Sequence, residues 1–258
     1  MALGNSTASG TAPFTPWGMW ATAGFSLIII AAFLFTQVVA SSALVAVELR
    51  QNPALDVTAY SQSLATNGLL LAVATCGGTL TTVALVGAFV RLRKPATLIQ
   101  YLHFYPVSAR VLVGWLSVVL ILALLWDLLT FWLGRPVVPA FMTAAYQSAG
   151  FLPLFWIALV VAAPVSEEVF FRGFLFEGIR YTRLGSVGAV ILTSLGWAVV
   201  HLQYDLYEIA TVFVLGVVLA LARLRTNSLY TTIAMHAMVN FLATLEVAVY
   251  LRYLPEGS

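Results

Sequence analysis

The chain has 258 residues, of which 61% are hydrophobic and only 9% carry a charge. Soluble domains are about half apolar and about one quarter charged, so this composition excludes a soluble globule. The net charge of +2 comes from few basic residues, and we expect no nucleic acid partner. Cys76 is the single cysteine, which excludes a disulfide framework and a metal site built from cysteines.

Long apolar stretches follow one another along the chain. A helix needs roughly 20 apolar residues to cross a bilayer, and continuous runs of that length favour helices over the alternating strands of a barrel. We therefore predict an all-α, polytopic transmembrane helical bundle of about 7–8 spans. The predicted spans lie near 18–42, 64–90, 111–133, 148–163, 165–182, 186–204, 208–223 and 229–251.

Two features organise these spans. Pro164 interrupts one apolar run, so 148–182 is either one bent helix or two pieces. The basic segment from Arg91 to Arg110 is predicted to be a cytoplasmic linker. With 148–182 as one crossing, eight Lys and Arg residues fall inside and three outside, which is the direction of the positive-inside rule. This places the N-terminus in the cytoplasm and the C-terminus on the other side.

The domain organisation is simple. Residues 1–16 are small and polar and are predicted to be a flexible N-terminal tail. Residues 17–258 are predicted to form a single transmembrane helical domain in contact with the lipid bilayer.

Charged residues concentrate in one apolar segment. Six of the 22 charged side chains lie between Glu167 and Arg183. A charge at membrane depth costs about 3 kcal/mol on insertion scales unless it is paired or faces water. Glu168 and Arg172 have the i,i+4 spacing of an ion pair, whereas Glu167 points about 100° away along the helix. The pattern predicts that Glu168 is tied to Arg172 and that Glu167 is free to face a cavity.

Two later stretches add polar groups at the same spacing. Trp197 precedes His201 by four residues, and His236 precedes Asn240 by four. A carboxylate beside a histidine can take the proton of a water that attacks a carbonyl carbon. A second histidine and an amide can donate hydrogen bonds to the oxyanion, at about 3 kcal/mol per donor in model enzymes. The set suffices for peptide hydrolysis without a covalent nucleophile.

Structural explanations compete with this interpretation. Taken alone, Glu168–Arg172 is an ordinary ion pair, and each histidine is an interhelical hydrogen-bonding residue. Their joint occurrence on three successive apolar stretches favours a functional site. We assign no role to the four other acidic residues near span ends, and expect four phenylalanines to pack against lipid or helices. These are Asp127, Glu177, Glu208 and Glu246, and Phe170, Phe171, Phe174 and Phe176.

The three motifs together resemble those of a known family. Glu167-Glu168-x-x-x-Arg172, followed by Gly173, resembles the first motif of the CPBP intramembrane proteases, a group that includes the type II CAAX prenyl endopeptidases and Abi-like bacteriocin-processing proteins. Trp197 takes the place of the usual phenylalanine four residues before His201. His236-x-x-x-Asn240 matches the third motif, and the family-like catalytic core covers about 150–245.

The resemblance implies an intramembrane endopeptidase of the glutamate type. It implies that Glu167 and His201 activate water, that His236 and Asn240 form the oxyanion site, and that Glu168 and Arg172 support the geometry. The Phe-to-Trp change is expected to matter little because an aromatic ring is kept. Implied partners are a peptide or a prenylated protein, in the plasma (inner) membrane of a prokaryote.

Three alternatives remain open. No cofactor is expected, but a zinc metalloprotease would use the same side chains, although His-Glu-x-x-His is absent from the sequence. A proton-coupled membrane transporter would use them as a relay. A non-catalytic scaffold or immunity protein would bind the transmembrane helix of a partner. The sequence does not decide the oligomeric state.

Overall fold

The computed structural model describes residues 15–253, and nearly all of the predicted tail, residues 1–16, lies outside the described residues. Most of this range is helical, and no strand occurs within it. The predicted helical bundle is therefore confirmed. The principal helices are α1 (Met19–Gln51), α3 (Gly68–Leu92), α5 (Ala109–Trp132), α10 (Gly185–Val199), α11 (Leu206–Thr226) and α12 (Leu229–Tyr253).

Six helical segments between residues 15 and 253 are long and apolar enough to cross a membrane. They are α1, α3, α5, α11, α12 and the continuous segment Leu152–Arg180. The predicted span at 186–204 is shorter than expected, because α10 ends at Val199. Its 15 residues extend about 22 Å, less than the thickness of the hydrocarbon core. The chain then turns at membrane depth before α11 begins.

The segment Leu152–Arg180 is one helix with changing pitch, which settles the question raised by Pro164. It consists of α7 (Leu152–Ile157), π-helical η2 (Ala158–Ala162), α8 (Ala163–Glu167), π-helical η3 (Glu168–Leu175) and α9 (Phe176–Arg180). Pro164 has no amide hydrogen to donate to the preceding turn, and a wide π turn there avoids a clash with the proline ring. The proline therefore widens the helix locally instead of ending it.

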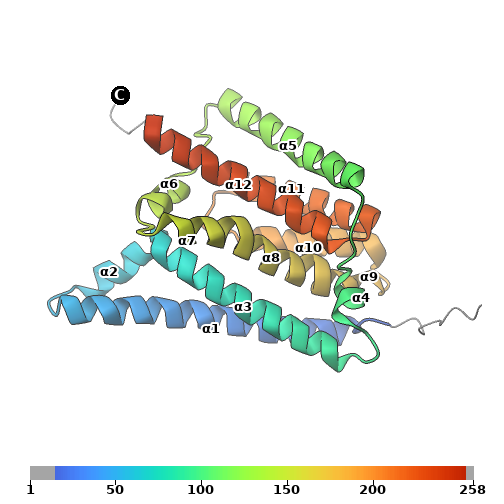
Figure 1. Ribbon diagram of the computed structural model, residues 1–258. Helices are drawn as coiled ribbons and strands as arrows, with labels where there is room; N and C mark the ends of the chain where they lie inside the picture. Colours follow the sequence, from blue (N-terminus) through green and yellow to red (C-terminus); the bar gives the residue numbers. More distant parts are fainter. Residues whose placement is uncertain (1–14, 254–258) are drawn as a thin grey trace, which may run out of the picture.

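This segment is the centre of the molecule. Half of its most apolar window is buried, compared with 6% for α1 and for α5. Figure 1 shows it between α12 on one side and α3 on the other, and both helices contact η2. The four phenylalanines of η3 and α9 are all buried, so they pack against helices and not against lipid.

Short helices close the two ends of the bundle. At one end lie α2 (Val57–Ser63), η1 (Leu64–Thr66) and α6 (Ala140–Gln147); at the other lies α4 (Leu98–Leu102). The predicted linker 91–110 is therefore more than a loop, because Tyr101 and Leu102 of α4 are buried in the bundle. The Tyr101 ring stacks on Phe174, with 5.9 Å between the centroids.

Candidate active site

The two adjacent glutamates face different surroundings, as their helical spacing predicts. The Glu168 side chain is fully buried, whereas 26% of the Glu167 side chain is exposed. Glu168 Oε1 accepts a hydrogen bond from Arg172 Nη1 at 2.9 Å. The same oxygen lies 3.0 Å from His236 Nδ1 on α12. Glu168 is thus held against α12, a contact that the residues around Glu168 in the sequence do not predict.

Arg172 completes a buried network behind this carboxylate. Its Nη2 donates to the carbonyl oxygen of Gly216 on α11 at 3.2 Å, and its guanidinium lies 4.5 Å from the centroid of the Trp197 ring. The side chain is 0% exposed. Together with the ion pair to Glu168, these contacts compensate the buried charge and hold η3, α10 and α11 together.

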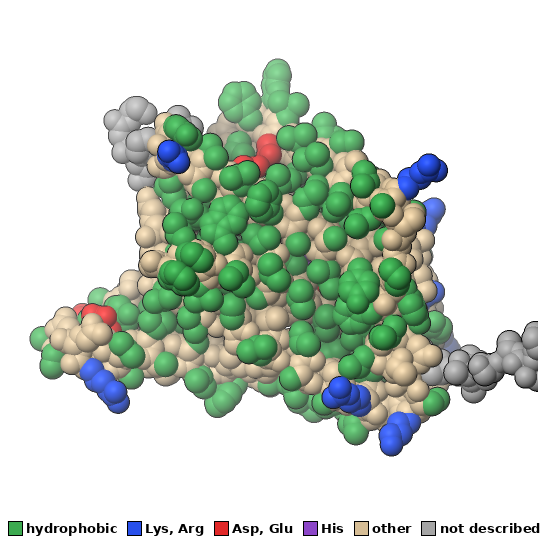
Figure 2. Space-filling view, in the orientation of Figure 1, with side chains coloured by type: hydrophobic (Ala, Val, Ile, Leu, Met, Phe, Trp, Pro, Cys, Tyr) green, Lys and Arg blue, Asp and Glu red, His purple; other side chains and the backbone are tan. Residues whose placement is uncertain are grey.

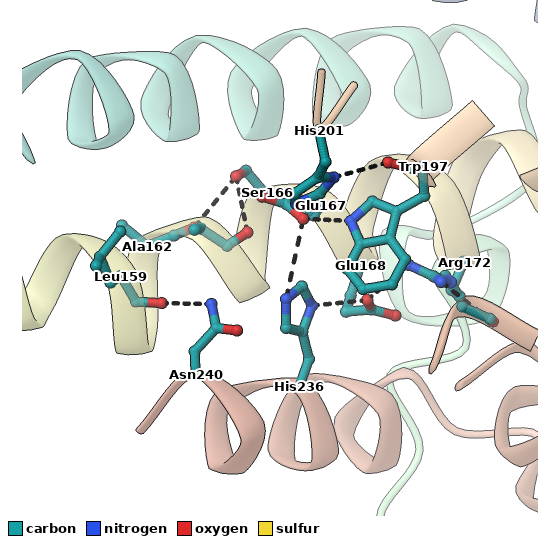
Figure 3. Close-up of polar contacts among 12 residues, drawn as sticks. Leu159, Ala162, Ser166, Glu167, Glu168, Arg172, Trp197, His201, His236 and Asn240 are labelled. Atoms are coloured by element: carbon teal, nitrogen blue, oxygen red, sulfur yellow. Dashed lines mark hydrogen bonds and ion pairs between the residues drawn. The ribbon is translucent and has the colours of Figure 1, made fainter. Parts of the chain in front are cut away.

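Glu167 receives a hydrogen bond that the sequence motif does not suggest. The indole Nε1–H of Trp197 donates to Glu167 Oε2. His236 Nε2 lies 3.9 Å from the same oxygen, close enough for electrostatic attraction but too far for a direct hydrogen bond. Figure 3 shows these groups converging from three helices.

The four-residue spacing predicts that Trp197 and His201 share one helical face, and this prediction is wrong. His201 lies beyond the end of α10. The chain leaves the helix after Val199, and His201 stands in the turn that follows. Its Nδ1 is 2.8 Å from the carbonyl oxygen of Trp197, and its ring stacks on Tyr204. Among residues 15–253, no hydrogen bond or ion pair joins His201 to Glu167 directly.

Asn240 lies one turn after His236 on α12. Its Nδ2 donates to the carbonyl oxygen of Leu159 at 2.8 Å, in the π-helical turn η2. One of its two amide hydrogens is therefore used within the protein, and the other remains to serve a ligand.

These side chains share one cavity of about 380 Å³. Its wall includes Glu167, Trp197, His201, His236 and Asn240. The cavity continues past these residues between α5, α11 and α12, and Asp127 and Glu246 also line it. The turn that carries His201 forms part of this wall through His201, Gln203 and Tyr204.

Glu177, to which we assigned no role, is the centre of a second buried cluster. Its Oε1 accepts a hydrogen bond from Arg223 at 2.8 Å and lies 3.4 Å from both Arg180 and His103. Arg223 Nε also donates to the carbonyl oxygen of Arg172 at 3.2 Å. The cluster therefore anchors η3 and α9 to α11.

Comparison with known proteins bears on the same segment. A family model described as "Type II CAAX prenyl endopeptidase Rce1-like" matches residues 149–242. Over this segment the chain is similar to the Rce1-like family. The match covers all six predicted site residues, and the resemblance inferred from the three motifs is confirmed.

One curated relative aligns over a similar length. The chain is 32% identical over 92 residues to an "Uncharacterized 24.3 kDa protein" of Escherichia coli. The alignment covers 34% of this chain and 42% of that protein, so the chain spans less than half the length of this curated relative. No solved structure matches the chain.

Sequence reasoning missed several partners of the site. The indole hydrogen bond of Trp197, the Glu168–His236 contact and the Leu159 carbonyl all join residues at least 30 positions apart. Tyr204, which lines the cavity and stacks on His201, was also missed. Its position three residues after His201 was the only available signal.

Proposed function

We propose that this protein is an intramembrane endopeptidase in which Glu167 acts as general base toward a water molecule. The observation that carries the proposal is the partly exposed Glu167 carboxylate in a cavity that two histidines also line. The similarity of residues 149–242 to the Rce1-like family supports a CAAX-type protease at the level of the family. The mechanism rests on the chemistry of the side chains.

Both histidines are held in the same way. Nδ1 of His201 faces the carbonyl oxygen of Trp197, and Nδ1 of His236 faces the Glu168 carboxylate. An acceptor at Nδ1 favours a form of the ring with a proton on Nδ1, either neutral or doubly protonated, and in both forms Nε2 is left for the ligand. Each ring thus presents Nε2 to the cavity.

The proposed steps use these groups in turn. Water held near Glu167 and His201 loses a proton to the carboxylate as its oxygen attacks the carbonyl carbon of the peptide. His236, when doubly protonated, donates from Nε2 to the oxyanion, together with the free amide hydrogen of Asn240. The proton taken by Glu167 then passes to the leaving amine, and the peptide bond breaks.

Glu168 and Arg172 are proposed as positioning residues. Neither side chain is exposed, so neither touches substrate. Glu168 fixes the ring of His236, and Arg172 balances the charge of Glu168 while its guanidinium packs on Trp197. The substrate is proposed to be a peptide segment at the membrane. The protein is proposed to lie in a prokaryotic plasma membrane with its N-terminus in the cytoplasm.

The test compares membrane fractions of cells that express the wild-type chain, Glu167→Gln or His201→Ala, with new protein termini identified by mass spectrometry. We expect the wild type to generate termini that neither variant generates, at equal levels of folded protein. His236→Ala and Asn240→Ala should each lower kcat by roughly 100- to 1000-fold with little change in KM, because oxyanion donors act in the transition state. If Glu167→Gln generates the same termini as wild type, Glu167 is not the base.

A further inference from the structure

Basic residues are unevenly divided between the two ends of the bundle. Eight lie at the end formed by the C-termini of α3, α9 and α11 and by the start of α5. They are Arg91, Arg93, Lys94, Arg110, Arg180, Arg183, Arg223 and Arg225. The opposite end has Arg50, Arg135 and Arg252, and Figure 2 shows the greater number of blue side chains on the right. By the positive-inside rule, the end with eight basic residues is cytoplasmic.

The cavity runs from the site toward the opposite end. Its lining includes the loop from Arg135 to Pro139, which follows α5, and Gln203 and Glu208, which flank the start of α11. Pro136, Val137 and Gln203 are exposed, so the cavity reaches the surface there. None of the eight basic residues of the other end lines it.

The protein is closed between the site and the basic end. Phe174 and Phe176 are fully buried there, and Tyr101 of α4 stacks beneath them on Phe174. The Glu177–Arg223 pair, also buried, fills the remaining space between α9 and α11. No residue of α4 lines the cavity. This cavity therefore offers no path to Glu167 for a polypeptide on the cytoplasmic side.

We propose that the substrate enters the cavity from the non-cytoplasmic side of the membrane, past the mouth formed by Pro136, Val137 and Gln203. The substrate class is then a membrane-anchored or exported polypeptide whose cleaved bond lies at the outer half of the bilayer. A prenylated tail displayed in the cytoplasm does not meet this requirement. This inference rests on the proposed peptidase function.

Thiol labelling tests the proposal on the full chain in bacterial cells. In a Cys76→Ser background, single cysteines replace Gln203 at the mouth, Ala54 in the exposed loop after α1, or Arg183 at the basic end. Intact cells are treated with a membrane-impermeant maleimide, with and without permeabilisation, and cleavage by each variant is compared before and after labelling. Ala54→Cys is the matched control, because it lies at the same end as Gln203 but does not line the cavity.

We expect Gln203→Cys and Ala54→Cys to label in intact cells and Arg183→Cys to label only after permeabilisation. Labelling should abolish cleavage by Gln203→Cys and leave cleavage by Ala54→Cys unchanged. Labelling of Arg183→Cys in intact cells, or full cleavage by labelled Gln203→Cys, would overturn the proposal. The labelling pattern does not depend on catalysis, so failure of the peptidase function appears separately, as identical termini from wild type and Glu167→Gln.

Discussion

Trp197 contacts two charged groups of the candidate site, the Glu167 carboxylate and the Arg172 guanidinium. As a motif position it is an aromatic substitute for phenylalanine, and we expected the exchange to matter little. In the structure its Nε1–H donates to Glu167, while its ring packs against Arg172. Phenylalanine offers the ring but no donor, so Trp197 connects the candidate base to the buried arginine in a way that phenylalanine would not.

Trp197→Phe should therefore lower cleavage although the aromatic ring remains. A hydrogen bond to a charged group is worth about 1.5–3 kcal/mol, which corresponds to a loss of kcat/KM of about tenfold to a hundredfold. The measurement is steady-state cleavage by purified protein. Trp156→Phe is the matched control, because Trp156 on α7 packs on Phe241 and does not line the cavity. Equal rates for both variants would remove the role assigned to the indole.

The adjacent glutamates allow a paired experiment with the same chemical change. Glu168→Gln removes a buried charge opposite Arg172 and should destabilise the protein by roughly 3–5 kcal/mol, since it leaves the guanidinium uncompensated. Glu167→Gln should abolish cleavage but leave Tm near the wild-type value, because Glu167 is partly exposed. Thermal unfolding in detergent distinguishes the two. A larger fall in Tm for Glu167→Gln would reverse the assignment of supporting and reactive carboxylate.

At the scale of elements, the start of α11 positions the turn that carries His201. Asp205 caps α11: its Oδ1 accepts from the backbone amide of Glu208 at 3.0 Å, and the Glu208 side chain accepts from the Asp205 amide. Asp205 also pairs with Arg135 across the mouth of the cavity. The amide of Glu208 and the charge of Arg135 hold the pKa of the Asp205 carboxyl below its usual range.

The cap predicts a pH-dependent difference between wild type and Asp205→Ala. Because the folded-state pKa is depressed, the stabilisation is complete above the unfolded value of about 4 and is lost as pH falls through the lower folded value. Asp205→Ala should thus lower Tm at neutral pH, and the two Tm values should converge in strong acid. Tm measured across pH checks this; a difference that grows toward acid would contradict the cap.

Close approach of α1 and α9 depends on one glycine. A Cβ at Gly178 would stand 2.2 Å from Oγ1 of Thr22, so any larger residue must separate the helices. Small residues of this kind let membrane helices pack closely. Gly178→Val should lower Tm clearly, whereas Gly24→Val on α1 should not, because a Cβ there meets nothing within 4 Å. Equal effects on Tm would indicate a loss of helix flexibility and not a clash.

At the scale of the whole molecule, the arrangement of donors bears on the zinc alternative. Within residues 15–253, no three His, Cys, Asp or Glu side chains are grouped so as to hold a metal ion. We therefore expect purified active protein to contain zinc well below one equivalent and to keep its activity with a chelator present. Stoichiometric zinc together with chelator-sensitive cleavage would favour the metalloprotease.

The sequence alone determined the membrane character, the positions of the long helices and the residues of the candidate site. These follow from local properties: the length of apolar runs, the i,i+4 spacing of Glu168 and Arg172, and the cost of charge in a bilayer. The sequence did not predict the helix boundaries at which the backbone departs from an α-helix. The π turns beside Pro164 and the early end of α10 before His201 have no clear local signal.

Tertiary structure alone decided which side chains meet. The contacts of His236 with Glu168, of Trp197 with Glu167 and of Asn240 with Leu159 bridge helices that are distant in the chain. Spacing along one helix defines a face but not the rotation of its neighbours, which depends on packing of all the helices at once. The same packing opens the cavity toward the end with few basic residues and closes it toward the other, where the side chains of Tyr101, Phe174 and Phe176 are buried.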